Sequence, residues 1–172
     1  MTMDGAELNK LESYERVAKG LAYVPQGRMI FSTMTVKENI ETGLVVHGES
    51  EVPGDIYELF PVLLEMKNRR GGNLSGGQQQ QLAIGRALVL EPTLLILDEP
   101  TEGIQPNVVH EIGDVLLRLN KEEGLTLLLV EQKLPFARRV ASDFTVLDKG
   151  RVVAGGPIQA LTDDVVKSHL TV

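Results

Sequence analysis

Two short segments carry residue types that could do chemistry together. The first, LLILDE from Leu94 to Glu99, is an apolar run that ends in two carboxylates. Such a run is typical of a buried strand, and open α/β sheets place ligand sites at the carboxyl ends of their strands. Asp98 could hold Mg²⁺ through water, and Glu99 could polarise an attacking water as a general base. The hexapeptide alone is equally compatible with a strand that ends in a solvated turn.

The second segment, LSGGQ from Leu74 to Gln78, has the residue types of a phosphate-binding helix start. Ser75 is a candidate N-cap, and Gly76 and Gly77 would expose backbone N–H groups that a phosphate can approach without a Cβ in the way. The same composition also occurs in flexible linkers. The continuation QLAIGRALVL is rich in helix formers, however, and this favours the helix interpretation.

The strands that must position these residues are short and mostly apolar. LAYV, residues 21–24, predicts a strand that Pro25 stops. TLLILD and TLLLV are apolar along almost their whole length, which predicts strands buried on both faces. FTVLD and RVVAG predict two further strands joined by a tight turn at Lys149 and Gly150.

Helical segments separate these strands. Thr35 and Glu38 have the spacing of a capping box, which predicts a helix over residues 35–46. A second helix is expected from Asp55, broken or kinked by Pro61. Three more helices are predicted at residues 78–90, 106–124 and 134–140. Strands that alternate with helices in this way predict an α/β fold with a largely parallel sheet.

Composition limits the function classes. The 172 residues are 42% hydrophobic, which is ordinary for a folded domain and too high for a disordered chain. A net charge of −7 argues against sequence-independent binding to nucleic acid, so no nucleic-acid partner is expected. Without cysteine there is neither a disulfide framework nor a thiolate metal site. No apolar run approaches the ~20 residues of a membrane span.

Taken together, the segment NLSGGQQQQLAIGRALVLEPTLLILDEPTEG closely resembles the ABC ATPase family. LSGGQ matches the signature motif, and LLILDE matches the Walker B strand with its catalytic glutamate. The Q-loop glutamine falls on Gln26 in YVPQGR, and the switch position, usually His in the family, falls on Gln132. A glutamine there can hydrogen-bond a γ-phosphate or water but cannot carry a proton at neutral pH.

The resemblance implies a P-loop NTPase-like (RecA-like) core with an added ABC α-helical subdomain, and ATP and Mg²⁺ as cofactors. It assigns the following roles: catalytic, Glu99 and Gln132; ATP-binding, Gln26, Leu74, Ser75, Gly76, Gly77, Gln78 and Asp98; metal-binding, Gln26 and Asp98.

Departures from the common pattern point to one group within the family. The usual Ser-Ala-Leu-Asp of the D-loop is replaced by Glu102-Gly103-Ile104-Gln105. Together with YVPQGRMIF, DEPTEGIQP and the terminal HLTV, this resembles the branched-chain amino acid and urea importer group, and within it the urea-importer ATP-binding subunit best. The resemblance therefore predicts an ATP-hydrolysing importer subunit that is driven by nucleotide-dependent dimerisation.

A Walker A loop, G-x-x-x-x-G-K-[ST], is absent from the sequence, which contains no Gly-Lys pair. We therefore expect an N-terminally incomplete chain that lacks the Walker A strand, loop and helix. In this family two subunits pair head to tail, and the signature of one caps the ATP held by the Walker A of the other. The chain alone is expected to bind ATP weakly if at all and to turn over negligibly.

The motifs divide the chain into four predicted segments: residues 1–26, the core up to the Q-loop; 27–73, the helical subdomain; 74–150, the core with signature, Walker B, D-loop and switch; and 151–172, a C-terminal strand and helices. The expected partners are a second ATP-binding subunit, membrane permease subunits that contact the helical subdomain and, indirectly, a periplasmic or surface solute-binding protein. The expected location is peripheral, on the cytoplasmic face of the inner or plasma membrane.

Two other interpretations stay open. Soluble ABC ATPases of DNA repair or chromosome organisation carry long coiled coils, and the sequence has no heptad pattern of that length. A non-catalytic module could pair with a complete subunit and supply only its signature in trans, although the intact Asp98-Glu99 pair argues against long degeneration. The transported solute is not readable from these residues.

Overall fold

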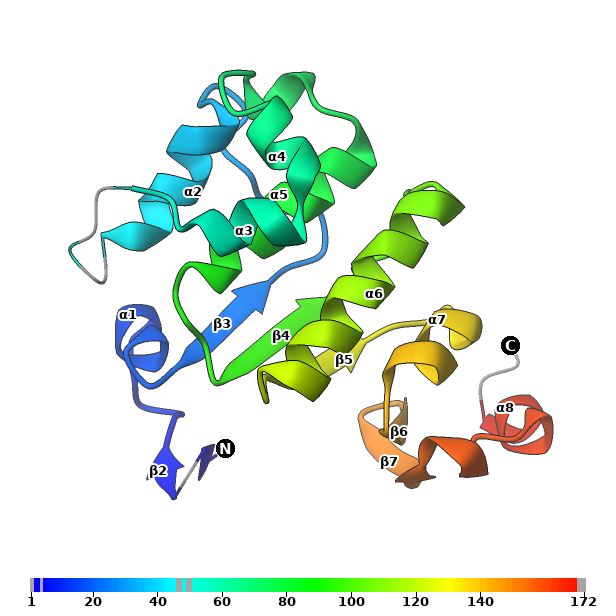
Figure 1. The fold of residues 1–172 in the computed structure, drawn as a ribbon. Coiled ribbons are helices and arrows are strands. Elements are labelled where there is room, and N and C mark those ends of the chain that lie inside the picture. Colours follow the sequence, from blue (N-terminus) through cyan, green and yellow to red (C-terminus); the bar gives the residue numbers. More distant parts are fainter. Residues whose placement is uncertain (1, 4, 46–47, 49–50, 170–172) are drawn as a thin grey trace. The chain divides into compact units, whose positions relative to one another are not determined.

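The computed structural model describes residues 2, 3, 5–45, 48 and 51–169. The chain forms two compact units, Met1–Val130 and Glu131–Val172 (Figure 1). The four segments predicted from the motifs rest on sequence landmarks, and their division of the chain stays a prediction.

A parallel sheet forms the centre of the first unit. Its strands are β3 (Leu21–Val24), β4 (Leu94–Asp98) and β5 (Thr126–Val130), in the order β3-β4-β5. Both pairings are parallel, so the carboxyl ends of all three strands meet at one edge of the sheet. The strand predicted at residues 21–24 is confirmed, as is the α/β class. Before this sheet, β1 (Thr2–Met3) pairs antiparallel with β2 (Ala6–Glu7), and α1 (Ser13–Val17) follows.

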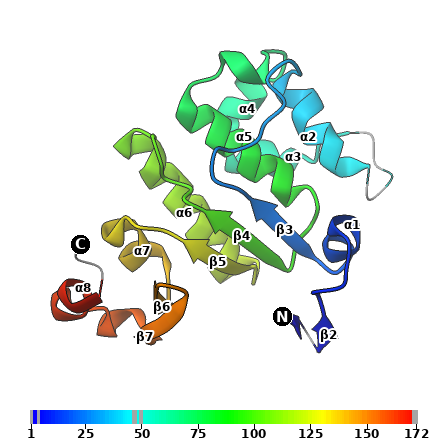
Figure 2. The same cartoon turned by 180° about the vertical axis from the view of Figure 1, so that it is seen from behind.

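The two faces of this sheet differ in burial. Leu95 and Leu97 are fully buried on one face, where α5 (Gly76–Leu88) and α6 (Pro106–Glu122) lie. On the other face Tyr23, Leu128 and Val130 are each about half exposed. Figure 2 shows the strands from the side opposite α6.

The prediction that TLLLV is buried on both faces is therefore wrong, because exposed and half-buried residues alternate along β5. For TLLILD it is right for one face and wrong for the other, because Leu94, Ile96 and Asp98 are only half-buried. An apolar run indicates burial on both faces only when layers cover both faces of the sheet. In the described part of the first unit, helices are packed against one face of the sheet.

A group of helices precedes α5, and its members are α2 (Val36–Leu44), α3 (Gly54–Leu59), α4 (Pro61–Glu65) and the 3₁₀ turn η1 (Gly71–Asn73). The predicted cap at Thr35 and the predicted break at Pro61 are both found, whereas α2 ends at Leu44, before the predicted Val46. Thr35 and Glu38 form the predicted capping box, and Phe60 separates α3 from α4 with Pro61 as first residue of α4. The predicted end of the first of these helices, Val46, lies outside the described residues. Buried Ile40, Leu63 and Ile84 form part of the core shared with α5.

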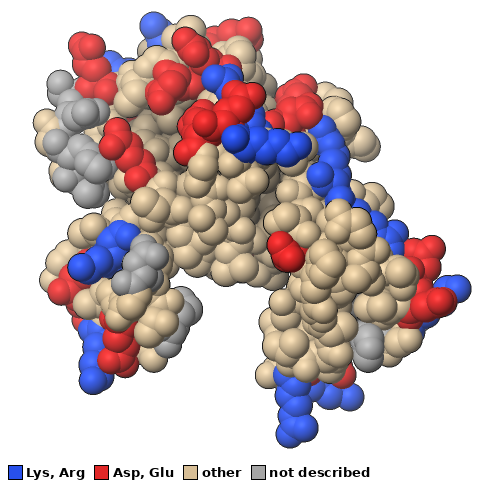
Figure 3. Space-filling view, turned by 60° about the horizontal axis from the view of Figure 1, so that its bottom comes forward, with Lys and Arg blue, Asp and Glu red and all other residues tan. Residues whose placement is uncertain are grey.

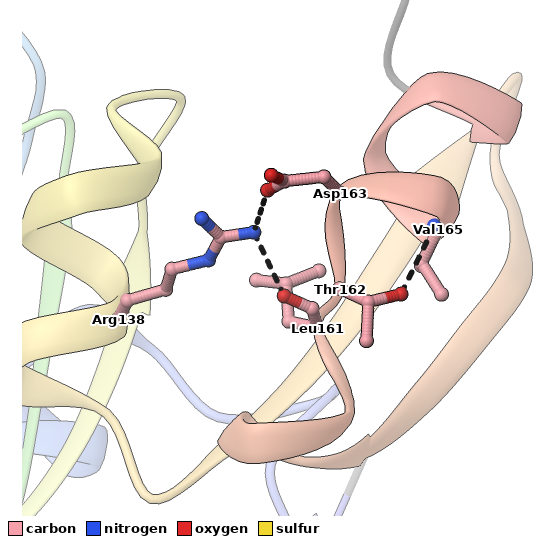
Figure 4. Close-up of polar contacts among 5 residues, drawn as sticks. All are labelled: Arg138, Leu161, Thr162, Asp163 and Val165. Carbon is pink, nitrogen blue, oxygen red and sulfur yellow. Dashed lines mark hydrogen bonds and ion pairs between the residues drawn. The ribbon is translucent and has the colours of Figure 1, made fainter.

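The second unit is built from α7 (Leu134–Val140), β6 (Asp143–Asp148), β7 (Arg151–Pro157), the 3₁₀ turn η2 (Ile158–Ala160) and α8 (Asp163–His169). β6 and β7 pair antiparallel around the predicted turn, where Lys149 and Gly150 have φ of 48° and 77°. The Nη2 atom of Arg138 donates to both Leu161 O and Asp163 Oδ1, each at 2.8 Å (Figure 4). These bonds hold α7 to the start of α8.

Candidate functional site

The LSGGQ segment begins a helix, as its composition predicts. Ser75 is the N-cap of α5: its Oγ accepts from the Gln78 N–H at 3.3 Å, and its own N–H donates to Gln78 Oε1 at 3.0 Å. The amides of Gly76 and Gly77 occupy the first turn, where N–H groups have no partner within the helix. Ser75 is exposed, so this helix start is accessible to an anion.

Both glycines also lie close to other parts of the molecule, which the sequence does not reveal. A Cβ on Gly77 would lie 2.8 Å from Cγ1 of Val108, so this glycine lets α5 approach α6. A Cβ on Gly76 would lie 3.3 Å from Nη2 of Arg28 and 3.4 Å from Gly103 O. Leu74 is buried, and its N–H donates to Gly71 O at 3.2 Å. The side chains of Leu74 and Gln78 thus have structural roles, and their contact with ATP stays a prediction.

Asp98 ends β4 at the carboxyl edge of the sheet, as predicted. The hydroxyl of Tyr23, on the neighbouring strand, donates to Asp98 Oδ2 at 3.1 Å. Partial desolvation, followed by this hydrogen bond and the negative charge of Asp98, raises the pKa of Tyr23 above its ordinary value. The parallel register that sets Tyr23 beside Ile96 places its hydroxyl within reach of Asp98. The sequence does not reveal this contact, because it depends on the register between two strands that are far apart along the chain.

Glu99 follows directly, with a different backbone conformation. Its φ is +48°, in the left-handed region that non-glycine residues rarely adopt. Its N–H donates to Val130 O on β5 at 2.9 Å, and its carbonyl accepts from the Glu102 N–H at 3.1 Å. A non-glycine residue keeps a left-handed backbone only where the surrounding structure maintains it, and such residues are frequent at functional sites. The turn that begins at Glu99 is thus fixed between two strands.

Gln26 reaches this turn from β3. Its Nε2 donates to Glu102 Oε2 at 3.0 Å. Arg28, two residues later, donates from Nη2 to the Glu102 carbonyl at 3.0 Å. The structure therefore brings together the Q-loop position, the segment after Glu99 and, through Arg28, the start of α5. Arg28 and Glu102 are functional candidates to which the motifs assign no role, because their contacts join segments more than 70 residues apart.

The residues at this edge fit Mg²⁺ as part of a nucleotide complex. Mg²⁺ binds through one or two carboxylates together with waters and phosphates. Asp98 supplies a carboxylate, and the Gln26 amide donates through Nε2 to Glu102, which leaves Oε1 as its oxygen ligand. No group of three or more His, Cys, Asp or Glu side chains suited to a metal occurs among the described residues. Asp98 and Gln26 together therefore suit an ion whose other ligands are phosphates and waters.

The remaining predicted site residue, Gln132, belongs to the second unit. It is exposed, and its N–H donates to Glu131 Oε1 at 2.9 Å. The geometry of the first unit neither includes nor excludes it, and its role stays a prediction.

A groove of about 360 Å³ opens beside the Q-loop, between β3, α2 and α5. Its described lining includes Arg28 and Arg86 and no Asp or Glu. Arg86 lies 5.1 Å from the ring centroid of Phe31 and donates from Nη2 to Met29 O at 2.8 Å. Burial lowers the pKa of Arg86 from its ordinary value. Phe31 and Met29, which are 46% and 70% exposed, add apolar surface to this groove beside the two arginines.

Surface charge and helix length bear on whether the chain contacts nucleic acid or crosses a membrane. On the face shown in Figure 3, basic and acidic side chains both occur, and the described basic ones do not gather into one large patch. The expectation of no nucleic-acid partner stays a prediction. None of the helices in the described part of the chain is both long and apolar enough to span a membrane.

Comparisons with known proteins agree with this geometry. The sequence model of a family described as ABC transporter matches residues 1–102. The chain is 42% identical over 153 residues to BraG of Pseudomonas aeruginosa, a high-affinity branched-chain amino acid transport ATP-binding protein, covering 87% of this chain and 65% of BraG. It is 35% identical over 164 residues to LivF of Archaeoglobus fulgidus, a probable branched-chain amino acid transport ATP-binding protein, covering 94% of this chain and 70% of LivF.

Solved structures show the same fold. The ADP conformation of the ATP-binding cassette MJ1267 superposes with a TM-score of 0.80 at 27% identity, covering 98% of this chain and 75% of that one. The ADP- and Pi-bound dimer of the cassette MJ0796 gives 0.79 at 25% identity, covering 91% and 72%. This chain thus spans about two thirds of BraG and about three quarters of MJ1267. With its signature helix, its Asp98-Glu99 strand end and its Q-loop in one parallel-sheet fold, the chain belongs to the ABC transporter family of ATP-binding proteins.

Proposed function

We propose that this chain works in the ATP-binding subunit of an importer for branched-chain amino acids or urea, and that the start of α5 caps ATP held by a second subunit. The observation that carries the proposal is the exposed Ser75 N-cap on a helix whose start is joined through Arg28 to Glu102, in the turn that begins at Glu99. BraG and LivF are by name branched-chain amino acid transport ATP-binding proteins, which supports that solute class. Urea rests on YVPQGRMIF, DEPTEGIQP and the terminal HLTV; residues 170–172 lie outside the described part.

The residues divide the work of hydrolysis. Mg²⁺, when bound with ATP, neutralises charge on the phosphate oxygens. Asp98 and Gln26 would hold it at the edge of the sheet. Glu99, fixed by its left-handed backbone and its bond to Val130, would orient and deprotonate the attacking water. Gln132 would hydrogen-bond the γ-phosphate or the water without taking a proton.

These 172 residues hold no Gly-Lys pair and therefore no phosphate-wrapping Walker A loop. We therefore expect residues 1–172 alone to bind ATP weakly and to hydrolyse it negligibly. A steady-state ATPase rate comparable to that of ordinary importer subunits, abolished by Glu99→Gln, would contradict this.

The groove beside the Q-loop supports a permease partner. Its apolar rim of Phe31 and Met29 suits a segment from a membrane subunit, and Arg28 and Arg86 suit a carboxylate on that segment. The adjoining helical segment, residues 27–73, would share this contact. The subunit would then lie peripherally at the cytoplasmic face of the inner or plasma membrane, with a solute-binding protein acting indirectly.

Association with a complete subunit tests the capping proposal. We expect residues 1–172 to associate, with ATP and Mg²⁺ but not with ADP, with an importer ATP-binding subunit that carries Walker A and has its own Walker B glutamate changed to glutamine. Sedimentation velocity measures this association. Ser75→Asp keeps a good N-cap but puts a negative charge where the phosphate docks, so it should abolish association.

Thr35→Asp is the matched control, because Thr35 is the N-cap of α2 in a second capping box. It should preserve association, and both variants should keep the thermal midpoint within a few degrees. Association that is independent of ATP, or that survives Ser75→Asp, would refute the capping role.

The absence of a Gly-Lys pair also favours a second candidate, a module that supplies only its signature in trans. Turnover by the mixed dimer with an unmodified complete subunit tests whether the signature is supplied in trans, and uptake by the assembled transporter distinguishes the two candidates. A module that acts only in trans leaves this turnover unchanged on Glu99→Gln and loses it on Ser75→Asp. Glu99→Gln in the assembled transporter abolishes solute uptake if the chain is catalytic and leaves uptake intact if it is not.

A further inference from the structure

The loop after β3 has an unusual backbone. Gly27, Arg28 and Met29 have φ of 78°, 67° and 45°, three consecutive residues in the left-handed region. Two of them carry side chains, and each such residue costs roughly 1–2 kcal/mol relative to an ordinary conformation. The Arg28 N–H donates to Pro25 O at 3.1 Å and the Met29 N–H to Gly27 O at 2.7 Å. Such a conformation persists only where contacts of the surrounding structure maintain it.

The side chain of Arg28 makes those contacts. Its Nη2 donates to Glu102 O at 3.0 Å, and its Nη1 is 3.5 Å from Gln79 Oε1. The guanidinium also lies against the first residue of α5, where a Cβ on Gly76 would be 3.3 Å from Nη2. One planar group therefore contacts both the start of the signature helix and the segment after Glu99. A guanidinium can do this because its N–H groups diverge in a fixed fork.

Glu102 is held from a second direction as well. The Gln26 amide donates to its carboxylate at 3.0 Å, while its N–H donates to Glu99 O at 3.1 Å. The Q-loop thus holds the turn that begins at Glu99 through two residues, one acting on the Glu102 side chain and one on its carbonyl.

We propose that Arg28 is a positioning residue, which fixes the LSGG start of α5 relative to the turn that carries Glu99. The positive charge of Arg28 lies at the start of α5. Its guanidinium sets the spacing between this helix start, which would cap the phosphate, and Glu99, which would act as general base. The inference rests on the proposed function, since it assigns Arg28 a role in that ATP site. It adds a residue for which the motifs give no role.

Two variants test the fork. Arg28→Lys keeps the positive charge but cannot bond Glu102 O and Gln79 Oε1 together, and Arg28→Ala removes both bonds. We expect hydrogen exchange at the Glu102 amide to rise about tenfold in both. We also expect ATP-dependent association with the complete subunit to weaken about tenfold, as loss of one charge-assisted hydrogen bond predicts. Thermal midpoints should stay within a few degrees of the unmodified chain.

Arg118→Lys is the control, since Arg118 pairs with Glu122 on the exposed side of α6. It should change neither exchange at Glu102 nor association. If Arg28→Lys behaves like the unmodified chain in both measurements, the positioning role is wrong. If the unmodified chain shows no ATP-dependent association, the proposed function fails, while exchange at Glu102 still decides whether Arg28 fixes the turn.

Discussion

At the scale of single residues, the signature glycines have two roles at once. Gly76 and Gly77 leave the helix start open to a phosphate, and they also let Arg28 and Val108 approach α5. The second role could not be predicted from the sequence, because Val108 lies 31 positions from Gly77 and Arg28 lies 48 positions from Gly76. Tyr23 and Arg28 were missed for the same reason: single polar residues near a strand end do not show which segment they will contact.

Gly77→Ala should therefore destabilise the chain without any ligand. The added Cβ would meet Val108 Cγ1 at 2.8 Å, and overpacking of this kind costs about 1–3 kcal/mol in unfolding free energy. Urea denaturation measures the loss. Val108→Ala in the same chain should recover most of it, because the clashing methyl groups are removed.

Gly54→Ala provides the comparison, since a Cβ on Gly54 would meet nothing within 4 Å. It should be neutral or slightly stabilising. Equal losses for Gly77→Ala and Gly54→Ala would show that packing against α6 is not the cause.

At the scale of elements, two helices begin with the same capping device but with different chemistry. α2 uses Thr35 and Glu38, whereas α5 uses Ser75 and Gln78. Hydrogen bonds donated by the Thr35 backbone N–H and then its hydroxyl lower the pKa of Glu38 below its ordinary value. A lowered pKa in the folded state adds stability above the pKa of the unfolded chain, and this is lost as pH falls through the folded value.

Acid should therefore weaken α2 and spare the cap of α5. We expect the difference in thermal midpoint between the unmodified chain and Glu38→Gln to shrink as pH falls from 6 towards 3. Gln78→Glu introduces a carboxylate at the corresponding position of α5, so it should make the start of that helix acid-sensitive. A difference between the unmodified chain and Glu38→Gln that does not change with pH would show that the Glu38 carboxylate adds nothing at α2.

Strands β4 and β5 show how far an apolar run can be interpreted. Leu95→Ala should cost about 2–5 kcal/mol in unfolding free energy, because Leu95 is fully buried. Leu128→Ala should cost less than about 1 kcal/mol, because Leu128 is 51% exposed. Urea unfolding of the two variants measures both. Similar costs would mean that the second face of the sheet is covered in solution.

Much of the element order was predictable. The caps at Thr35 and Ser75, the break at Pro61 and the turn at Lys149-Gly150 each follow from local chemistry, and all are found. Burial of β5 was not predictable, because a strand's own residues do not show what packs against its faces.

At the scale of the whole molecule, the chain divides at Val130 and Glu131 into units with separate internal contacts. Arg138→Ala should therefore act locally. Loss of its bonds to Leu161 O and Asp163 should speed hydrogen exchange at the Val165 and Val166 amides by up to about tenfold, while exchange at Gln79 in the first unit stays unchanged.

Asp163→Asn keeps the bond to Leu161 O and removes only an exposed ion pair, so its effect should be smaller. Faster exchange at Gln79 in Arg138→Ala would show that the two units unfold as one.

The loop of Gly27, Arg28 and Met29 has a further consequence for how this molecule can move. Sterically forbidden φ/ψ space separates left-handed from right-handed backbone. The loop therefore cannot bend by small increments, and it changes only when whole peptide units rotate. Because Arg28 lines the groove and also contacts Glu102, an occupant of the groove meets a segment with a few discrete shapes rather than a continuous range. Displacement of Arg28 would then be all-or-none.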